Sequence, residues 1–205
     1  MSKKKKQNSN IQVPEGIEGL IFDLDGTLAD NMPLHFQAWS NACSSYDLPC
    51  VLEEMLKYAG LSTYKIALEV FKKYKGNHNP KLAKELAEKK ISEYDKLHDL
   101  TKPFPEVVNI VYKYYNKLPM AVGTGGIRAA AKKTLELLDL TKYFVAVVAA
   151  EDVENHKPEP DTFLKCAEFM KVDPANCLVF EDGDRGVEAA KRAGMQVVDI
   201  REYIE

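Results

Sequence analysis

The chain has 205 residues, of which 45% are hydrophobic and 29% are charged, and its formal net charge at pH 7 is -3. This length and composition indicate a globular protein with one domain, or with one domain that carries a sizeable insertion. Nucleic-acid binding and membrane insertion are not expected, because the charge balance is acidic and no stretch approaches the ~18 apolar residues of a membrane span.

The first 14 residues form a segment that we expect to be a disordered basic tail. It contains consecutive lysines from Lys3 to Lys6, and because no apolar region follows them it is not a secretory signal. None of the cysteines forms a CxxC pair, which argues against a zinc or redox motif. We therefore expect free thiols and a cytoplasmic protein.

A short apolar run then predicts a buried strand, with the sequence GIEGLIFDL at residues 16–24. From about Asn31 to Thr101 the apolar residues recur at helical spacing, and no convincing strand interrupts them. Pro103 and Pro105 end this helical stretch.

Beyond Pro105, predicted helices alternate with predicted strands at residues 118–124, 143–150, 176–182 and 195–200. Such alternation is typical of right-handed βαβ units, so we expect an α/β fold with a Rossmann-like, doubly wound parallel sheet. The first strand belongs to this sheet, which makes the long helical stretch an insertion with a lobe of its own. The predicted organisation is an α/β core domain at residues 15–30 and 102–205 and an inserted all-helical domain at residues 31–101.

Polar residues and glycines follow the predicted strands at their carboxyl ends. The residues concerned are Asp23 and Asp25 after the first strand, Thr124, Gly125 and Gly126 after the second, Lys157 after the third, and Glu181 and Asp182 after the fourth. Each motif alone is common in turns and helix caps. Because ligands bind at the carboxyl ends of the strands in an open parallel sheet, the set predicts one shared site.

The chemistry of this set indicates a metal ion and a phosphate group. Asp23 and Asp182 would bring negative charges together, and a hard divalent cation such as Mg²⁺ relieves that repulsion. Thr124 and the backbone N–H groups of Gly125 and Gly126 are expected to open a helix and bind an anion, with Lys157 adding positive charge.

The two aspartates of the first strand end suit two different roles in phosphoryl transfer. Asp23 can attack phosphorus and form an aspartyl-phosphate. Asp25 can protonate the leaving oxygen and later accept a proton from water. Gly26 permits a sharp turn, Thr27 is expected to hold that turn by hydrogen bonds, and Asp184 is expected to cap the next helix, which would start at Arg185.

These motifs resemble those of the haloacid dehalogenase superfamily. The matching stretches cover nearly the whole chain after the tail and are, in order, DLDGT, GTGG, HKPEPD and FEDGDRGVEAAKRAG. The resemblance implies an inserted helical cap domain and Mg²⁺ held by Asp23, Asp182 and the carbonyl of Asp25, with Glu181 just outside the ligand set. It also implies that Thr124 and Lys157 hold the phosphoryl group. The dehalogenase reaction itself is not expected, because Asp25 and Asp182 are both present.

Within this superfamily the chain is most similar to the β-phosphoglucomutase-like subfamily, and in particular to its small sugar-phosphate phosphatases. The mutase uses an arginine of the cap loop to hold a second phosphate, and Thr63 stands at that position here. His35 matches a histidine that the mutase shares with several phosphatases. The cap residues that we expect to be candidates for substrate contact are His35, Ser62, Thr63 and Lys65.

The expected function is therefore that of a Mg²⁺-dependent phosphatase, acting on a small phosphorylated metabolite, a sugar phosphate, through an aspartyl-phosphate. A β-phosphoglucomutase-type phosphomutase is the alternative, and a non-catalytic binding or regulatory protein on the same fold is a remote one. We expect a monomer, with neither nucleic acid nor membrane among its partners.

Overall fold

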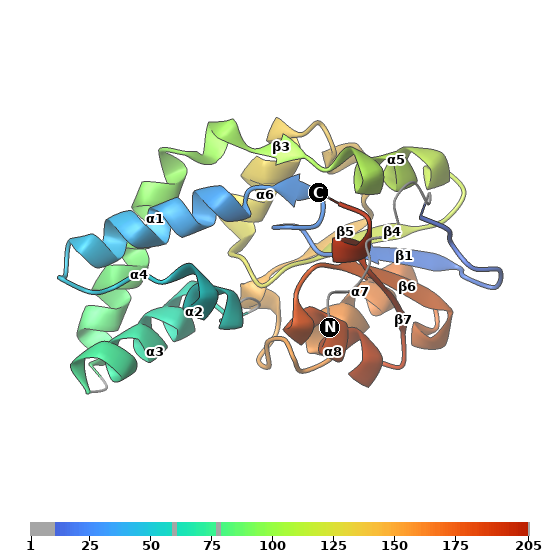
Figure 1. The fold of residues 1–205 in the computed structure, drawn as a ribbon. Coiled ribbons are helices and arrows are strands. Elements are labelled where there is room, and N and C mark those ends of the chain that lie inside the picture. Colours follow the sequence, from blue (N-terminus) through green and yellow to red (C-terminus); the bar gives the residue numbers. More distant parts are fainter. Residues whose placement is uncertain (1–10, 59–60, 77–78, 205) are drawn as a thin grey trace.

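A parallel sheet lies at the centre of the protein, whose computed structural model describes residues 11–58, 61–76 and 79–204 (Figure 1). The predicted tail therefore lies outside the described residues as far as residue 10. The strands are ordered β5-β4-β1-β6-β7, and each adjacent pair is parallel. Their bounds are Gly19–Phe22 for β1, Met120–Gly123 for β4, Ala146–Val148 for β5, Cys177–Glu181 for β6 and Gln196–Asp199 for β7. The predicted α/β fold with a parallel sheet is confirmed.

Helices cover both faces of this sheet (Figure 1). The helices α5 (Pro105–Tyr114) and α6 (Arg128–Leu137) pack on one face, and α7 (Asp161–Met170) and α8 (Asp184–Arg192) pack on the other. The strands β1, β4 and β6 are consequently buried along their whole length, which is why they read as continuous apolar runs in the sequence. On the α5 and α6 face, the rings of Phe22 and Phe180 stack with their centroids 4.6 Å apart.

The strand order places β1 between β4 and β6. The chain moves from β1 outward to β4 and β5 on one side, and then returns to β6 and β7 on the other. This reversal opens a crevice at the carboxyl end of β1, where ligands bind in folds of this kind. The residues that follow β1, β4 and β6 therefore lie next to one another.

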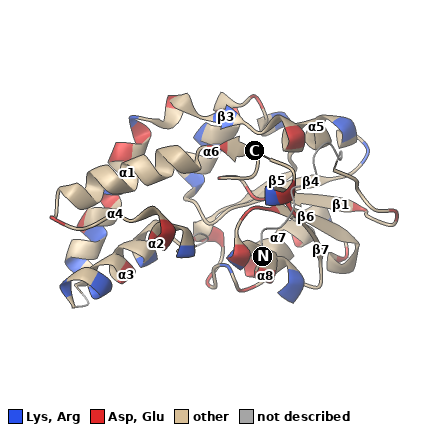
Figure 2. Ribbon diagram, viewed as in Figure 1, with Lys and Arg blue, Asp and Glu red and all other residues tan. Residues whose placement is uncertain are grey.

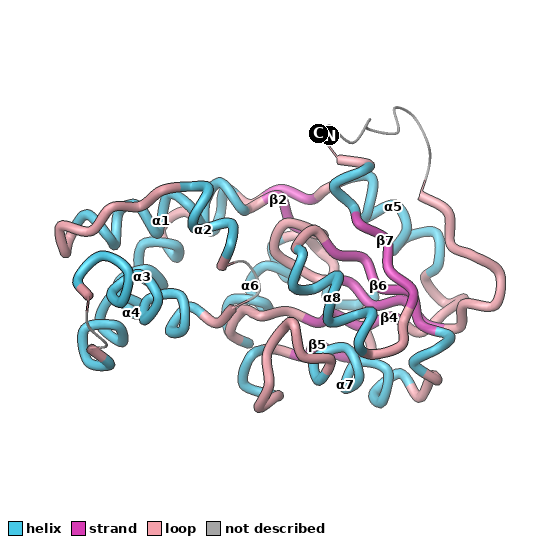
Figure 3. The backbone as a smooth tube through the Cα atoms, turned by 60° about the horizontal axis from the view of Figure 1, so that its bottom comes forward, coloured by secondary structure: helices cyan, strands magenta, loops and turns pink. Residues whose placement is uncertain are grey.

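The segment inserted after β1 consists of helices that lie beside the sheet (Figure 3). They are α1 (Met32–Ser44), α2 (Leu52–Lys57), α3 (Thr63–Lys75) and α4 (Pro80–Asp95). They share an apolar core of their own, which includes Trp39, Phe71 and Leu86. We call α1 to α4 the cap helices. Among the described helices of the chain, none combines the length and apolar character needed to cross a bilayer.

Two short strands mark where the chain leaves the sheet for the cap helices and where it returns. The strand β2 (Ala29–Asp30) pairs antiparallel with β3 (Lys102–Pro103), so that Ala29 faces Pro103 and Asp30 faces Lys102. A short 3-10 helix, His98–Leu100, precedes β3. The two segments that connect the sheet to the cap helices therefore lie side by side and are hydrogen-bonded to each other.

The predicted cap of α8 is wrong by one residue. Gly183 occupies the N-cap position, and Asp184 is the first helical residue. The Asp184 carboxylate lies 2.8 Å from Nη2 of Arg201, so an ion pair takes the place of the expected bond to the helix backbone.

The stacked phenylalanines give a test of the sheet core. The change Phe180→Ala should lower the free energy of unfolding by ~3–5 kcal/mol, because it leaves a cavity beside a fully buried ring. Phe169→Ala is the matched control, since this ring on α7 is 53% exposed. Urea unfolding of both variants measures the difference, and equal losses would contradict the assignment of Phe180 to the core.

Candidate active site

The polar residues that follow the strands line one cavity of about 430 Å³ between the sheet and the cap helices. The residues from the sheet side that line it include Asp23, Asp25, Thr124, Gly125, Lys157, Glu181 and Asp182. The parallel sheet brings these residues together although they are distant in the sequence. The cavity also contains all of the sheet-side residues that the sequence analysis assigned to catalysis, to phosphate binding and to the metal.

Lys157 is a buried cation within a group of carboxylates. Its Nζ atom lies 2.6 Å from Oδ1 of Asp23 and 3.6 Å from Oε1 of Glu181, and all three residues are buried. Burial opposes the charge of Lys157, yet the attraction of Asp23 and Glu181 raises its pKa above the ordinary value. Lys157 therefore stays protonated and neutralises part of the acidic cluster.

The carboxylates of this cluster carry more negative charge than Lys157 compensates. Burial raises the pKa of Asp23, although Lys157 opposes that shift. Burial and the nearby Asp23 raise the pKa of Glu181 well above its ordinary value and that of Asp182 to about 7. One carboxylate oxygen from each of Asp23, Glu181 and Asp182 lies within 4.8 Å of the others. This set of hard oxygen ligands suits a divalent cation, which would relieve the repulsion.

The turn after β1 shapes the metal end of the cavity. Gly26 has a φ of 87°, and a Cβ atom at this position would lie 2.3 Å from Oδ2 of Asp182. The hydroxyl of Thr27 donates to Oδ1 of Asp182 at 3.1 Å. Thr27 therefore orients the carboxylate of Asp182, a partner that the sequence analysis did not foresee.

Asp25 faces a different set of partners, at the border with the cap helices. The side-chain amide of Asn31 donates to Oδ1 of Asp25 at 2.6 Å, and Nε2 of His35 lies 3.4 Å from the same atom. Burial alone would raise the pKa of Asp25, but His35 and Asn31 outweigh it and lower the pKa to about 2. Asp25 is therefore held as a carboxylate in this arrangement.

Lys90 of α4 extends this network from the cap side. Its Nζ atom donates to Nδ1 of His35 at 2.8 Å and lies over the ring of Tyr94. Burial lowers the pKa of Lys90 to about 8. Burial, and then the charge of Lys90, also lower the pKa of His35, although Asp25 opposes the shift. The cap helices thus supply His35 beside Asp25 and the charge of Lys90 behind it.

The loop after β4 differs from its predicted form. We expected a helix to open at Gly125 and Gly126, but α6 begins at Arg128. The N–H of Gly126 donates to the hydroxyl of Thr124 at 2.9 Å. Thr124 and the glycines line the cavity as a tight turn before the helix.

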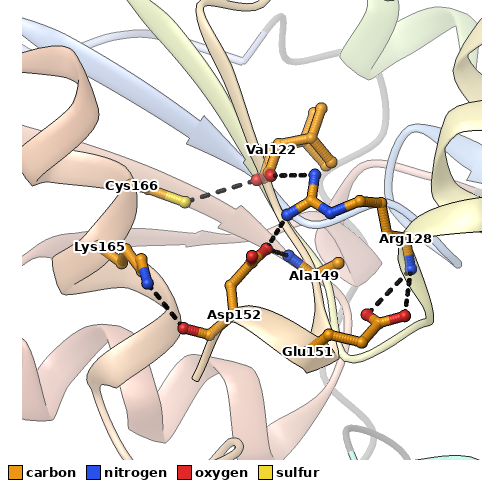
Figure 4. Close-up of polar contacts among 8 residues, drawn as sticks. Val122, Arg128, Ala149, Glu151, Asp152, Lys165 and Cys166 are labelled. Carbon is orange, nitrogen blue, oxygen red and sulfur yellow. Dashed lines mark hydrogen bonds and ion pairs between the residues drawn. The ribbon is translucent and has the colours of Figure 1, made fainter.

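Three residues outside the cavity connect this loop to the loop after β5 (Figure 4). Both carboxylate oxygens of Glu151 accept the backbone N–H of Arg128, at 3.1 and 3.0 Å. The guanidinium of Arg128 pairs with Asp152, whose carboxylate also accepts the N–H of Ala149 at 2.7 Å. We call Arg128, Glu151 and Asp152 the interloop cluster. It holds the Thr124 loop against the segment that leads to Lys157.

Of the candidates that the sequence offered from the cap, His35 and Thr63 line the cavity. Within the described residues, Ser62 and Lys65 do not line it. The hydroxyl of Ser62 instead accepts the N–H of Lys65 at 3.4 Å and caps α3, while Lys65 is exposed.

Sequence reasoning missed Asn31, Lys90 and Tyr94. Asn31 lies four residues after the end of the first motif, DLDGT, and a polar residue so close to that motif could have drawn attention to it. Lys90 carries no such signal, because it lies among several lysines in a charged helix. Only the structure shows that Lys90 is buried while Lys89 is not.

The fold and the site together define a class of protein, an α/β enzyme with an acidic site at the switch point of its sheet and a helical insertion above it. The chain belongs to the haloacid dehalogenase-like hydrolase family, whose sequence profile matches residues 20–200. The resemblance seen in the sequence is thereby confirmed.

Similar proteins include named phosphatases. The chain is 43% identical to the fructose-1-phosphate phosphatase YqaB of Escherichia coli, over 91% of this chain and 98% of that protein. It is 33% identical to a phosphorylated carbohydrates phosphatase of Thermotoga maritima, over 88% of this chain and 83% of that one. A crystal structure of β-phosphoglucomutase from Clostridium difficile superimposes with a TM-score of 0.80 at 24% identity, over 88% and 83% of the two chains, and shows the same fold.

The interloop cluster gives a test of how the Thr124 loop is held. Glu151→Ala should lower the free energy of unfolding by ~1 kcal/mol, because it removes the acceptor at the N-terminus of α6. Glu154→Ala is the control, since Glu154 is exposed on the same segment. Urea unfolding compares them, and indistinguishable midpoints would show that Glu151 contributes nothing.

The contact between Lys90 and His35 gives a test by titration. Lys90→Met should raise the pKa of the His35 imidazole, because it removes a positive charge that disfavours protonation. An NMR titration of the histidine ring signals measures this shift, with His35→Gln to assign the signal. Lys89→Met, one residue away on the cap helix, should leave the pKa of His35 unchanged; a shift of equal size in both variants would argue against the contact.

Proposed function

We propose that the chain is a Mg²⁺-dependent phosphatase that hydrolyses a small phosphorylated metabolite of the sugar-phosphate class through an aspartyl-phosphate on Asp23. The observation that carries this proposal is the separation of two carboxylate environments in one cavity. Asp23 lies among Lys157, Glu181 and Asp182, while Asp25 lies among neutral and cationic partners. The names of the phosphatases that resemble the chain support the reaction class and the substrate class.

The metal would be held by Asp23, Asp182 and the carbonyl of Asp25, with Glu181 as the remaining carboxylate of the cluster. Mg²⁺ prefers a few carboxylate ligands together with waters and a substrate phosphate oxygen. It would supply positive charge that neutralises the phosphoryl oxygens and the like charges of the cluster.

In the first half of the reaction, different residues bind the phosphoryl group, attack phosphorus and protonate the leaving oxygen. Thr124 and Lys157 hold the phosphoryl group, so that a carboxylate oxygen of Asp23 faces phosphorus. A bond forms between that oxygen and phosphorus as the bond from phosphorus to the substrate oxygen breaks. Asp25, which is a carboxylate in the cavity as described, takes up a proton from solvent when substrate binds and gives it to the departing oxygen, which leaves as an alcohol.

In the second half, water attacks the phosphorus of the aspartyl-phosphate and Asp25 accepts its proton. The bond to Asp23 breaks, inorganic phosphate leaves, and Asp25 is protonated again, so both aspartates are back in the forms in which they began the turnover. Since His35 and Lys90 belong to the cap helices, the position of the cap sets how strongly Asp25 is held as a carboxylate. Closure of the cap would exclude bulk water and place the substrate alcohol against the cap helices.

The same cavity argues for hydrolysis over transfer to a second hydroxyl. A phosphomutase must also bind a second phosphate under the cap. Among the described cap residues that line the cavity, Lys90 is the one cation, and it already donates to His35. All residues of the proposed mechanism come from one chain, so the proposed reaction does not require a second subunit.

Phosphate release from a panel of sugar phosphates tests the function. The panel contains fructose 1-phosphate, 6-phosphogluconate and β-glucose 1-phosphate, each with Mg²⁺ and with chelator. We expect metal-dependent release, and Asp23→Asn should lower kcat by roughly a thousandfold or more, because it removes the nucleophile. Asp25→Asn should lower kcat by roughly a hundredfold or more, through loss of acid-base catalysis.

The control for these variants is Asp173→Asn, which changes an aspartate that caps a 3-10 helix remote from the cavity lining. Conversion of β-glucose 1-phosphate to glucose 6-phosphate without release of phosphate would contradict the proposed phosphatase function and show that the chain is a phosphomutase. No reaction with any compound would favour a binding protein.

A further inference from the structure

The cavity has two chemically different halves. The half formed by the sheet consists of charged residues, one threonine and glycines. In the half formed by the cap, nine of the twelve lining residues in the described part of the chain are apolar, and the others are His35, Thr63 and Lys90. The proposed phosphatase uses the first half, whereas the second half must receive the alcohol part of the substrate.

Polar groups are few in the cap half, and Lys90 and His35 already face each other there; the Nε2 atom of His35 is buried without a hydrogen-bond partner in the part of the chain that the structure describes. Lys90 donates to His35 at 2.8 Å, and the other ring nitrogen of His35 faces Asp25 at 3.4 Å. Lys90 also lies over the rings of Trp39 and Tyr94. Within the described residues, the cap therefore offers substrate hydroxyls only the side chains of Thr63, His35 and Lys90, and Lys90 already donates to His35.

The helix α2 presents large apolar side chains to the cavity. Leu52 and Leu56 are 48% and 54% exposed, and both line the cavity together with Met55. Their spacing of three and four residues places them on one face of the helix. Opposite them, α1 contains no charged residue (Figure 2) and contributes Phe36 and Trp39. Exposed apolar side chains that converge on a cavity are stabilised when a ligand covers them.

A highly hydroxylated sugar is a poor match for this surface. Each hydroxyl group that leaves water without a hydrogen-bond partner is penalised, whereas C–H surface on leucine and aromatic side chains is favoured. We propose that the cavity selects phosphate monoesters whose alcohol part is poor in hydroxyl groups, such as a deoxy sugar, and that Leu52, Leu56 and Phe36 form the contact surface. This inference rests on the proposed phosphatase function and names the substrate class within it.

Matched pairs of esters test the selectivity. The pairs are 2-deoxyribose 5-phosphate against ribose 5-phosphate, and 2-deoxyglucose 6-phosphate against glucose 6-phosphate. Within each pair the phosphate is bound to the same primary oxygen, so the intrinsic reactivity is equal. Removal of the hydroxyl should raise kcat/KM roughly tenfold, and n-butyl phosphate should also be hydrolysed.

A variant of the apolar wall tests the named residues. Leu56→Gln should reduce the preference for the deoxy member of each pair severalfold, because it supplies a hydrogen-bonding group where the hydrocarbon surface stood. Leu137→Gln is the matched control, since Leu137 is 41% exposed on α6 and does not line the cavity. Both leucines are partly exposed, so both variants should fold, and circular dichroism checks this.

The possible outcomes separate the two proposals. Hydrolysis of the panel with the fully hydroxylated member equal or better in each pair overturns this inference and leaves the phosphatase intact. An unchanged preference in Leu56→Gln likewise overturns it. No hydrolysis of any ester, including n-butyl phosphate, overturns the phosphatase and this inference with it.

Discussion

The buried ammonium of Lys157 is the interaction on which the site depends. It lies between Asp23 and Glu181 and compensates part of a cluster that also contains Asp182. A buried ion pair of this kind is held only where the surrounding chain keeps its partners in place, because removal of one partner leaves an uncompensated charge. The remaining excess of negative charge suits a second cation, so the arrangement that the fold stabilises also offers the oxygen ligands that a metal ion would need.

Two glycines make room for these carboxylates. A Cβ atom at Gly186, in the first half of α8, would lie 1.6 Å from Oε1 of Glu181, and one at Gly26 would lie 2.3 Å from Oδ2 of Asp182. Alanine is favoured over glycine within a helix by ~1 kcal/mol, so Gly186 is retained against helix propensity. The close approach of backbone to carboxylate therefore limits where the acidic side chains can point, and Lys157 is held between Asp23 and Glu181.

The sequence could predict most of the sheet and the residues at its edge, because buried parallel strands read as apolar runs and their carboxyl ends converge by topology. It could not predict the surroundings of Asp25. The burial of Lys90 follows from the packing of α4 against α1, and nothing in the lysine-rich sequence of α4 distinguishes Lys90 from Lys89. The starts of α6 and α8 were also misplaced, because the partners of these helix ends, Glu151 and Arg201, lie far along the chain.

The pairing of β2 with β3 has a consequence for how such an enzyme diversifies. Because Ala29 faces Pro103 across one short ladder, both ends of the inserted segment are anchored at adjacent points. Helices between these points can be lengthened, exchanged or recombined without moving the strands that carry Asp23, Thr124 and Asp182. Descendants of one ancestral gene could therefore acquire new substrates by changing the insertion alone, while inheriting the phosphoryl chemistry unaltered.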